Sequence, residues 1–282
     1  MRQHFRCRAC SAMIGHRTIA QAGADLQVED EDDDRDDYYG ELPYTPFDQI
    51  DWTALRRGLT SLQLFDDPYL SLQITNLEIV DRFITQLEQE TLQHVGDRMD
   101  IGQLAFLNAQ SQMWIFSAYE LLRTWRQRAK DIVKLSQTGG LVLKIKALKT
   151  DPGYLHPTRQ MRAEQLERVA TDPGIVDAIK GDLRLTHIQF ALLEHLRVSL
   201  AKHEVSGKPK QVAYAPGCGR VNSWCGSLDY QLESGRVILG TLSHRDVADA
   251  MRGLNDRSQI PTDQNLADFE ESMRVSELPD SP

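Results

Sequence analysis

The fold class of this chain follows mainly from one stretch of sequence, residues 100–138, DIGQLAFLNAQSQMWIFSAYELLRTWRQRAKDIVKLSQT. The stretch contains no proline, and no glycine after Gly102, so nothing in it interrupts a helix. An unbroken helix of this length would span roughly 50 Å. Its middle part, residues 113–122, is apolar on almost every side, and a helix of that kind is buried among other elements. We therefore expect a long central helix with further helices packed around it.

Helix start signals flank this stretch on both sides. Thr75 and Glu78 have the spacing of a capping box, and an apolar stripe with the helical period follows them. Pro157 and Pro173 each suit the first position of a helix. A further long helix is expected over about 182–204. Together these signals predict a bundle of long helices.

The period of the pattern changes near the C-terminus. Apolar and polar residues alternate over 227–242 around a turn, which predicts a β-hairpin. A lone hairpin is marginally stable in water, so we expect this one to dock on the helices. Ser243 and Asp246 then have the spacing of a cap for a short helix. The hairpin side chains expected to face the helices are Leu228, Tyr230 and Leu232.

The fold prediction is thus a mostly α protein, a bundle of long helices with one small C-terminal β-hairpin packed on it. Three segments are expected along the chain: a disordered acidic N-terminal extension at 1–40, a single helical domain at 41–256 and an acidic C-terminal tail at 257–282. Residues 29–37 are almost all acidic, and such a block repels itself and buries too little surface to fold.

The overall composition excludes several classes of protein. The 282 residues are 41% hydrophobic and 26% charged, which is ordinary for a globular protein. No run of 18 apolar residues exists, so we predict no membrane span. Four cysteines are too few for a disulfide scaffold, which favours a reducing, cytoplasmic setting. The net charge of −9 excludes a uniformly basic nucleic-acid binder.

The charge is nevertheless segregated along the chain. Residues 41–100 carry an excess of acids, whereas residues 123–149 are strongly basic and a second basic run covers 197–220. Two interpretations remain open. The basic segments face the acidic one within the fold, or they form a local basic face that binds a partner.

Common cofactor and metal motifs are missing. The chain has no G-x-x-x-x-G-K-[ST] and no G-x-G-x-x-G after a strand, so we predict no nucleotide cofactor. H-E-x-x-H and G-x-S-x-G are also missing. Cys7 and Cys10 form a single C-x2-C pair near His4 and His16, for which a zinc site and an unstructured leader are the two interpretations. We predict neither a metal nor a cofactor.

Residues 184–204, RLTHIQFALLEHLRVSLAKHE, carry the most suggestive chemistry. On the expected helix, apolar residues define a core face, and Arg184, His195 and Lys202 form a basic strip beside it. His203 lies at the C-terminal end, where the helix dipole favours its cationic form. Near a phosphate such a histidine acts as an acid or a base close to neutral pH. The alternative interpretation is a histidine that only completes the core or the helix end.

A bundle of long helices whose late helix carries Arg197 and then His203, an R-x5-H spacing, resembles the HEPN superfamily of bacterial and archaeal defence and toxin proteins. The resemblance covers at most residues 75–205. It implies either a metal-independent endoribonuclease that acts as a dimer, with the Arg–His pairs of both copies facing one cleft, or an RNA-binding module like the inactive members of the superfamily. By this resemblance His203 is the acid/base and Arg197 contacts the phosphate or the transition state.

RNA cleavage requires few groups from a protein. RNA carries its own nucleophile, the 2′-OH, so an enzyme has to orient it, take its proton and stabilise charge on the phosphate. One histidine and one arginine suffice for this without a metal. The residues expected to hold the RNA strand are Arg123, Arg126, Lys130, Lys144 and Lys202.

The competing hypothesis is a non-catalytic helical interaction or scaffold protein. The aromatic-rich stretch 114–125 would then be core or an oligomer interface. Because the apolar stretch has to be covered on several sides, we expect a homodimer under either hypothesis.

Overall fold

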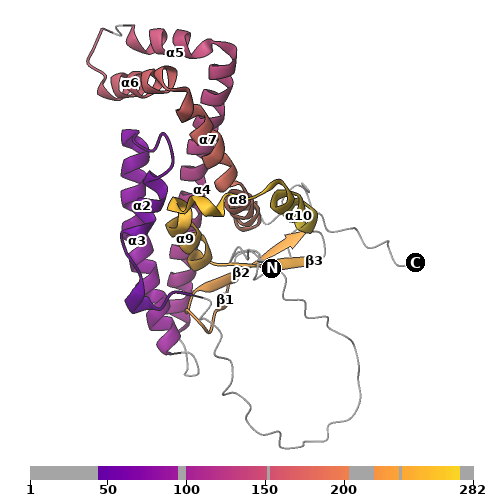
Figure 1. The fold of residues 1–282 in the computed structure, drawn as a ribbon. Helices are drawn as coiled ribbons and strands as arrows, with labels where there is room; N and C mark the ends of the chain where they lie inside the picture. Colours follow the sequence, from indigo (N-terminus) through magenta and orange to yellow (C-terminus); the bar gives the residue numbers. More distant parts are fainter. Residues whose placement is uncertain (1–43, 95–99, 151–152, 203–218, 235–236, 274–282) are drawn as a thin grey trace, which may run out of the picture.

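The computed structural model describes residues 44–94, 100–150, 153–202, 219–234 and 237–273. Within them the protein is a helical bundle with a small antiparallel sheet near the C-terminus, as the sequence predicts (Figure 1). The expectations for residues 1–40, including Cys7 and Cys10, lie outside the described residues. In the described part of the chain, no helix has both the length and the apolar character needed to cross a membrane.

The central element is α4 (Ile101–Thr138), which runs through the middle of the bundle (Figure 1). The Asp100 carboxylate caps its first turn by accepting a hydrogen bond from the Gly102 backbone N–H. Gly139 ends it in the left-handed conformation, with φ 71°, which a glycine adopts without strain. Most of the apolar stretch 113–122 is buried, as expected for a central helix.

Helix α3 (Pro68–Gln93) packs along α4. It begins earlier than the Thr75–Glu78 spacing predicts, because Asp67 caps Pro68 at the first helical position. The hydroxyl of Thr75 instead bonds the Ser71 carbonyl inside the helix. The predicted capping box is therefore wrong.

Between α4 and the sheet, the described chain forms four helices, and two of them start at the predicted prolines. The long helix expected over 182–204 is instead two helices, because the chain turns at Thr186, with φ −87° and ψ 3°. The pair α5–α6 lies at one end of α4, away from the sheet (Figure 1). The four helices are α5 (Gly140–Lys149), α6 (Pro157–Thr171), α7 (Pro173–Leu185) and α8 (His187–Lys202).

The predicted hairpin is confirmed, and it is extended by one short strand. The strand order is β1-β2-β3, all antiparallel, with a register shift between Leu232 and Glu233. The strands are β1 (Arg220–Val221), β2 (Leu228–Ser234) and β3 (Val237–Leu242).

The hairpin docks on the helices through the predicted face. The side chains of Leu228, Tyr230 and Leu232 are all buried in the common core. The Tyr230 hydroxyl donates to Oδ1 of Asn108 on α4 at 2.9 Å. The Nε2 atom of His195 on α8 lies 2.5 Å from the Glu233 carbonyl oxygen.

The remaining elements complete the bundle. The predicted Ser243–Asp246 capping box is present at the start of α9. Within the segment 257–282, which the sequence assigns to an acidic tail, the structure has a helix whose Phe269 is buried. These elements are η1 (Phe47–Gln49), α2 (Ala54–Thr60), α9 (His244–Arg252), η2 (Gly253–Asn255), η3 (Arg257–Gln259) and α10 (Asp263–Met273).

Candidate functional site

Three of the residues predicted for RNA chemistry, Arg123, Arg126 and Arg197, lie where α8 packs on α4. Tyr119 of α4 and Phe190 of α8 stack there, with ring centroids 5.6 Å apart and an interplanar angle of 14°. Tyr119 is nearly buried and Phe190 is half-buried. The packing of these two long helices holds both rings in place, and the rings line the base of the site.

Two guanidinium groups lie against these two rings. The Cζ atom of Arg197 lies 5.3 Å from the Tyr119 ring centroid, and that of Arg126 lies 4.9 Å from the Phe190 centroid. A cation over an aromatic face is attracted to it by about 1 kcal/mol. The ring therefore favours this position of the Arg197 guanidinium, which remains half-exposed.

Acidic groups and a second exposed arginine surround the Tyr119 hydroxyl. This hydroxyl donates to Oε1 of Glu194 at 3.1 Å. Burial and the Glu194 carboxylate raise the pKa of Tyr119, while Arg197 and Arg123 act in the opposite direction. Arg197 and Arg123 thus both lie close enough to Tyr119 for their charges to be felt there. Arg123 also forms an ion pair of 2.8 Å with Glu120.

Arg126 occupies a different place from the one expected for an RNA contact. Its guanidinium is buried and donates to the Leu183 carbonyl at 2.8 Å and to the Thr186 hydroxyl. Burial lowers the pKa of Arg126 to about 10. In the structure this side chain connects α4 to the turn between α7 and α8.

The other basic residues follow the outer surface of α4 and α5. Arg123 and Lys130 are exposed and lie seven residues apart on α4, which places them on one face about 10 Å from each other. Lys134 continues this line one turn further, and Lys144 is exposed on α5. Lys202 is the last residue of α8. His203 lies outside the described residues, as do Cys7 and Cys10.

Sequence analysis missed a buried ionic cluster between α3 and α9. His244 is fully buried, and its Nδ1 lies 2.8 Å from Oε1 of Glu88. Its Nε2 lies 3.3 Å from Oδ1 of Asp81, and Arg252 forms an ion pair of 2.5 Å with the same carboxylate. The Trp114 ring packs edge-on against the imidazole, with centroids 4.5 Å apart.

The charges of this cluster stabilise one another. Burial alone would lower the pKa of His244, but the carboxylates of Glu88 and Asp81 outweigh it and raise the pKa to about 9. Burial would likewise raise the pKa of Asp81, but His244 and Arg252 outweigh it and lower the pKa. The imidazole is therefore a cation at neutral pH.

A turn of the chain closes the cluster from the sheet side. The Ser227 hydroxyl donates to Oε1 of Glu88 at 2.6 Å. Gly226, with φ 74°, packs so tightly on the Glu88 carbonyl that a side chain there would overlap it. The cluster is thus sealed by α3, α9 and this turn, and its chemistry is structural in character.

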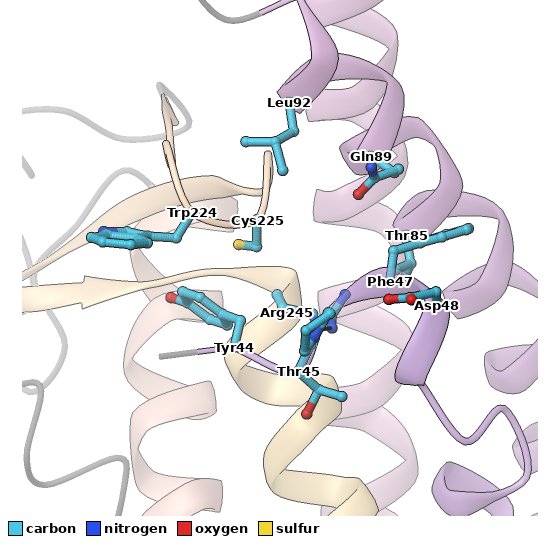
Figure 2. A pocket seen from close by; sticks show the side chains of 11 residues that line it. Tyr44, Thr45, Phe47, Asp48, Thr85, Gln89, Leu92, Trp224, Cys225 and Arg245 are labelled. Atoms are coloured by element: carbon cyan, nitrogen blue, oxygen red, sulfur yellow. Dashed lines mark hydrogen bonds between the residues drawn. The ribbon is translucent and has the colours of Figure 1, made fainter. Parts of the chain in front are cut away.

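A groove of about 310 Å³ lies beside the cluster, between residues 44–48, α3 and the turn at 224–225 (Figure 2). Burial raises the pKa of the Cys225 thiol far above its usual range, so the thiol is neutral and a poor nucleophile. Arg245 is committed to the Thr45 carbonyl and to Asp249. The groove therefore offers shape and apolar surface, without a reactive pair.

One sequence signal could have revealed the cluster. Asp81 and Glu88 are seven residues apart and follow the same meridian of α3 as Leu77 and Ile84. Carboxylates on an apolar meridian indicate buried, paired charges. Their partners, however, come from α9, more than 150 residues away.

In the part of the chain that the structure describes, no group of three or more His, Cys, Asp or Glu side chains is arranged to hold a metal ion. No family model, no curated protein and no solved structure matches this chain.

Proposed function

We propose that the α4–α8 face binds RNA and that the protein is a metal-independent endoribonuclease with Arg197 and His203 as its catalytic residues. The observation that carries the proposal is the placement of Arg197 over the Tyr119 ring, with exposed Arg123 beside it. A guanidinium fixed in this way presents its planar fork to a phosphate with little loss of side-chain freedom. A HEPN-like defence or toxin protein of the bacterial cytoplasm fits this chemistry.

The proposed reaction divides the work between the RNA and two side chains. The 2′-OH attacks the adjacent phosphorus in line and displaces the 5′-oxygen of the next nucleotide. His203 takes the proton of the 2′-OH, and its imidazolium form then gives a proton to the leaving 5′-oxygen. Arg197 stabilises the charge that develops on the phosphate. The basic residues Arg123, Lys130, Lys144 and Lys202 hold the rest of the strand.

The cleavage test uses purified protein and labelled RNA in EDTA. We expect cleavage of RNA but not of DNA, because DNA lacks the 2′-OH. His203→Ala should abolish it, Arg197→Ala should lower the rate by about 10²–10³-fold, and Arg197→Lys should restore little. His94→Ala, on an exposed histidine at the end of α3, is the matched control. Cleavage that persists in His203→Ala would overturn the assignment.

A binding test distinguishes the proposed RNA contact of Arg123 from the structural role of Arg126. Arg123→Ala should weaken RNA binding and lower the slope of log K against log salt by about 0.7, because one phosphate contact is lost from a single strand. It should leave the unfolding free energy unchanged. Arg126→Ala should instead destabilise the fold, because it leaves the Thr186 turn without its partner. Equal effects of both changes on binding and on stability would contradict this division.

The second candidate is the non-catalytic helical interaction protein, again as a homodimer. The observation that favours it is a row of exposed apolar side chains on α3. Protein that neither cuts nor binds RNA in the assays above would leave this candidate as the better one.

A further inference from the structure

The outer face of α3 carries large apolar side chains that nothing in the described structure covers. Tyr69, Leu72 and Ile79 are 60%, 58% and 63% exposed, and Phe83 is 44% exposed. Scattered apolar residues are normal on a protein surface. These four, however, share one face of a single helix.

Their spacing is that of a coiled-coil seam. The steps from Tyr69 to Leu72, Asn76, Ile79 and Phe83 are three, four, three and four residues. This is the a/d pattern of a heptad repeat, which forms a straight stripe suited to a neighbouring helix. Asn76 occupies an a position in the middle of the stripe and is exposed.

Helix α4 widens the stripe into a patch. The rings of Phe83 and Phe106 pack edge-to-face at 6.2 Å, so the two helices join at this point. Met113, 61% exposed, lies two turns further along the same side of α4 as Phe106. The six large side chains expose on the order of 600 Å² in all, at the upper end of what a monomer shows.

We propose that this patch, centred on Asn76, is the interface of a homodimer, and that α3 of one copy packs parallel to α3 of the other. At complete burial of these side chains, two copies would remove about 1,200 Å² from water, against the roughly 1,000 Å² that a stable interface needs. A two-fold axis along the stripe places each residue against its own copy, so the apolar rows cover each other.

Asn76 is the reason for choosing a second copy as the partner. An amide both donates and accepts, so two copies of Asn76 satisfy each other across the axis. An asparagine at a single a position fixes the register and the two-stranded state of a parallel coiled coil. The stripe itself contains no charged residue, so it has nothing with which to recognise a nucleic acid or an anionic lipid surface.

The inference does not rest on RNA binding, and its test is separate. Sedimentation velocity of the full chain should give twice the mass of one chain. Ile79→Glu should give a monomer with an unchanged circular dichroism spectrum, since the side chain is exposed. Ile238→Glu on β3 is the matched control, because Ile238 is 56% exposed but lies away from the patch. It should leave the dimer intact.

A crosslinking experiment tests the register. Asn76→Cys should form an intermolecular disulfide readily under mild oxidation, above the level of the unchanged chain with its native cysteines. Gln127→Cys, exposed on α4 outside the patch, should not. A monomeric wild type at about 100 μM, a dimer that survives Ile79→Glu, or equal crosslinking at both positions would each overturn the proposal.

Discussion

On most surface helices the charged side chains face the solvent and the apolar ones face the core. Helix α3 departs from this on both of its faces. Its inner face buries Asp81 and Glu88, whereas its outer face exposes Leu72, Ile79 and Phe83. The inner charges have partners supplied by α9. Of the outer apolar groups, Phe83 contacts the Phe106 ring of α4, and all three remain largely exposed in the described chain. The buried charges of the inner face are thus matched within one copy, and the apolar side chains of the outer face are matched, by our proposal, between two copies.

The difference follows from what each kind of group requires. A buried carboxylate is tolerated only with a partner at hydrogen-bond distance, so Asp81 and Glu88 fix where α9 docks. An apolar side chain requires only that water be removed, which any fitting surface provides. The inner face therefore specifies the fold, and the outer face is available for assembly.

The largest effect is expected from breaking the inner cluster. His244→Ala leaves two buried carboxylates with Arg252 as their main cationic partner, so the unfolding free energy should fall by about 3–5 kcal/mol. Urea denaturation followed by circular dichroism measures it, in the Ile79→Glu background so that dimerisation does not contribute. His94→Ala should change little. A loss below about 1 kcal/mol for His244→Ala would mean that the cluster is not charged.

The two faces can also be compared by truncating one isoleucine on each face to alanine. Ile84→Ala, on the inner face, should lower the unfolding free energy by about 2–5 kcal/mol, because the side chain is fully buried. Ile79→Ala, on the outer face, should stay within about 0.5 kcal/mol of the wild type when the protein is dilute enough to be monomeric. Similar losses at both positions would show that the outer face is covered within one copy.

The pH dependence sharpens the contrast, because the inner face of α3 contacts His244 of α9. The pKa of His244 is raised from 6.5 to about 9, so its stabilisation is complete below pH 6.5 and is lost as the pH rises through 9. The unfolding free energy should fall by about 2 kcal/mol between pH 7 and pH 9. The His244→Ala variant should lack this fall. A wild type with equal stability at both pH values would contradict a cationic His244.

The sequence predicts those parts of the fold that depend on local signals. Pro157, Pro173 and the Ser243–Asp246 pair mark helix starts through contacts within one turn, and all of them are found. The hairpin is also local, because its alternation and turn lie in one stretch.

One error is local, because the Thr75–Glu78 spacing places the start of α3 too late and Asp67 caps the helix at Pro68. The other errors arise where distant contacts decide. The turn at Thr186 receives the guanidinium of Arg126 from a helix 60 residues earlier, which no local pattern announces. Arg126 itself was expected at the surface because the run 123–149 is basic. Its position four residues after buried Leu122 places it on the inner meridian instead.

The smallest effect is expected at Asn76, and it tests the outer face alone. Asn76→Leu replaces the polar layer of the proposed seam by an apolar one, so the dimer should bind about tenfold more tightly, or ~1.4 kcal/mol. The two α3 helices should also be able to shift relative to each other, because an apolar layer at position 76 packs in more than one alignment of the helices. In this background, cysteines introduced at Leu72 and Ile79 should crosslink to each other as well as to their own copies. Sedimentation equilibrium and disulfide mapping measure the two effects. Unchanged affinity would place Asn76 outside the interface, since an exposed amide has no influence on association.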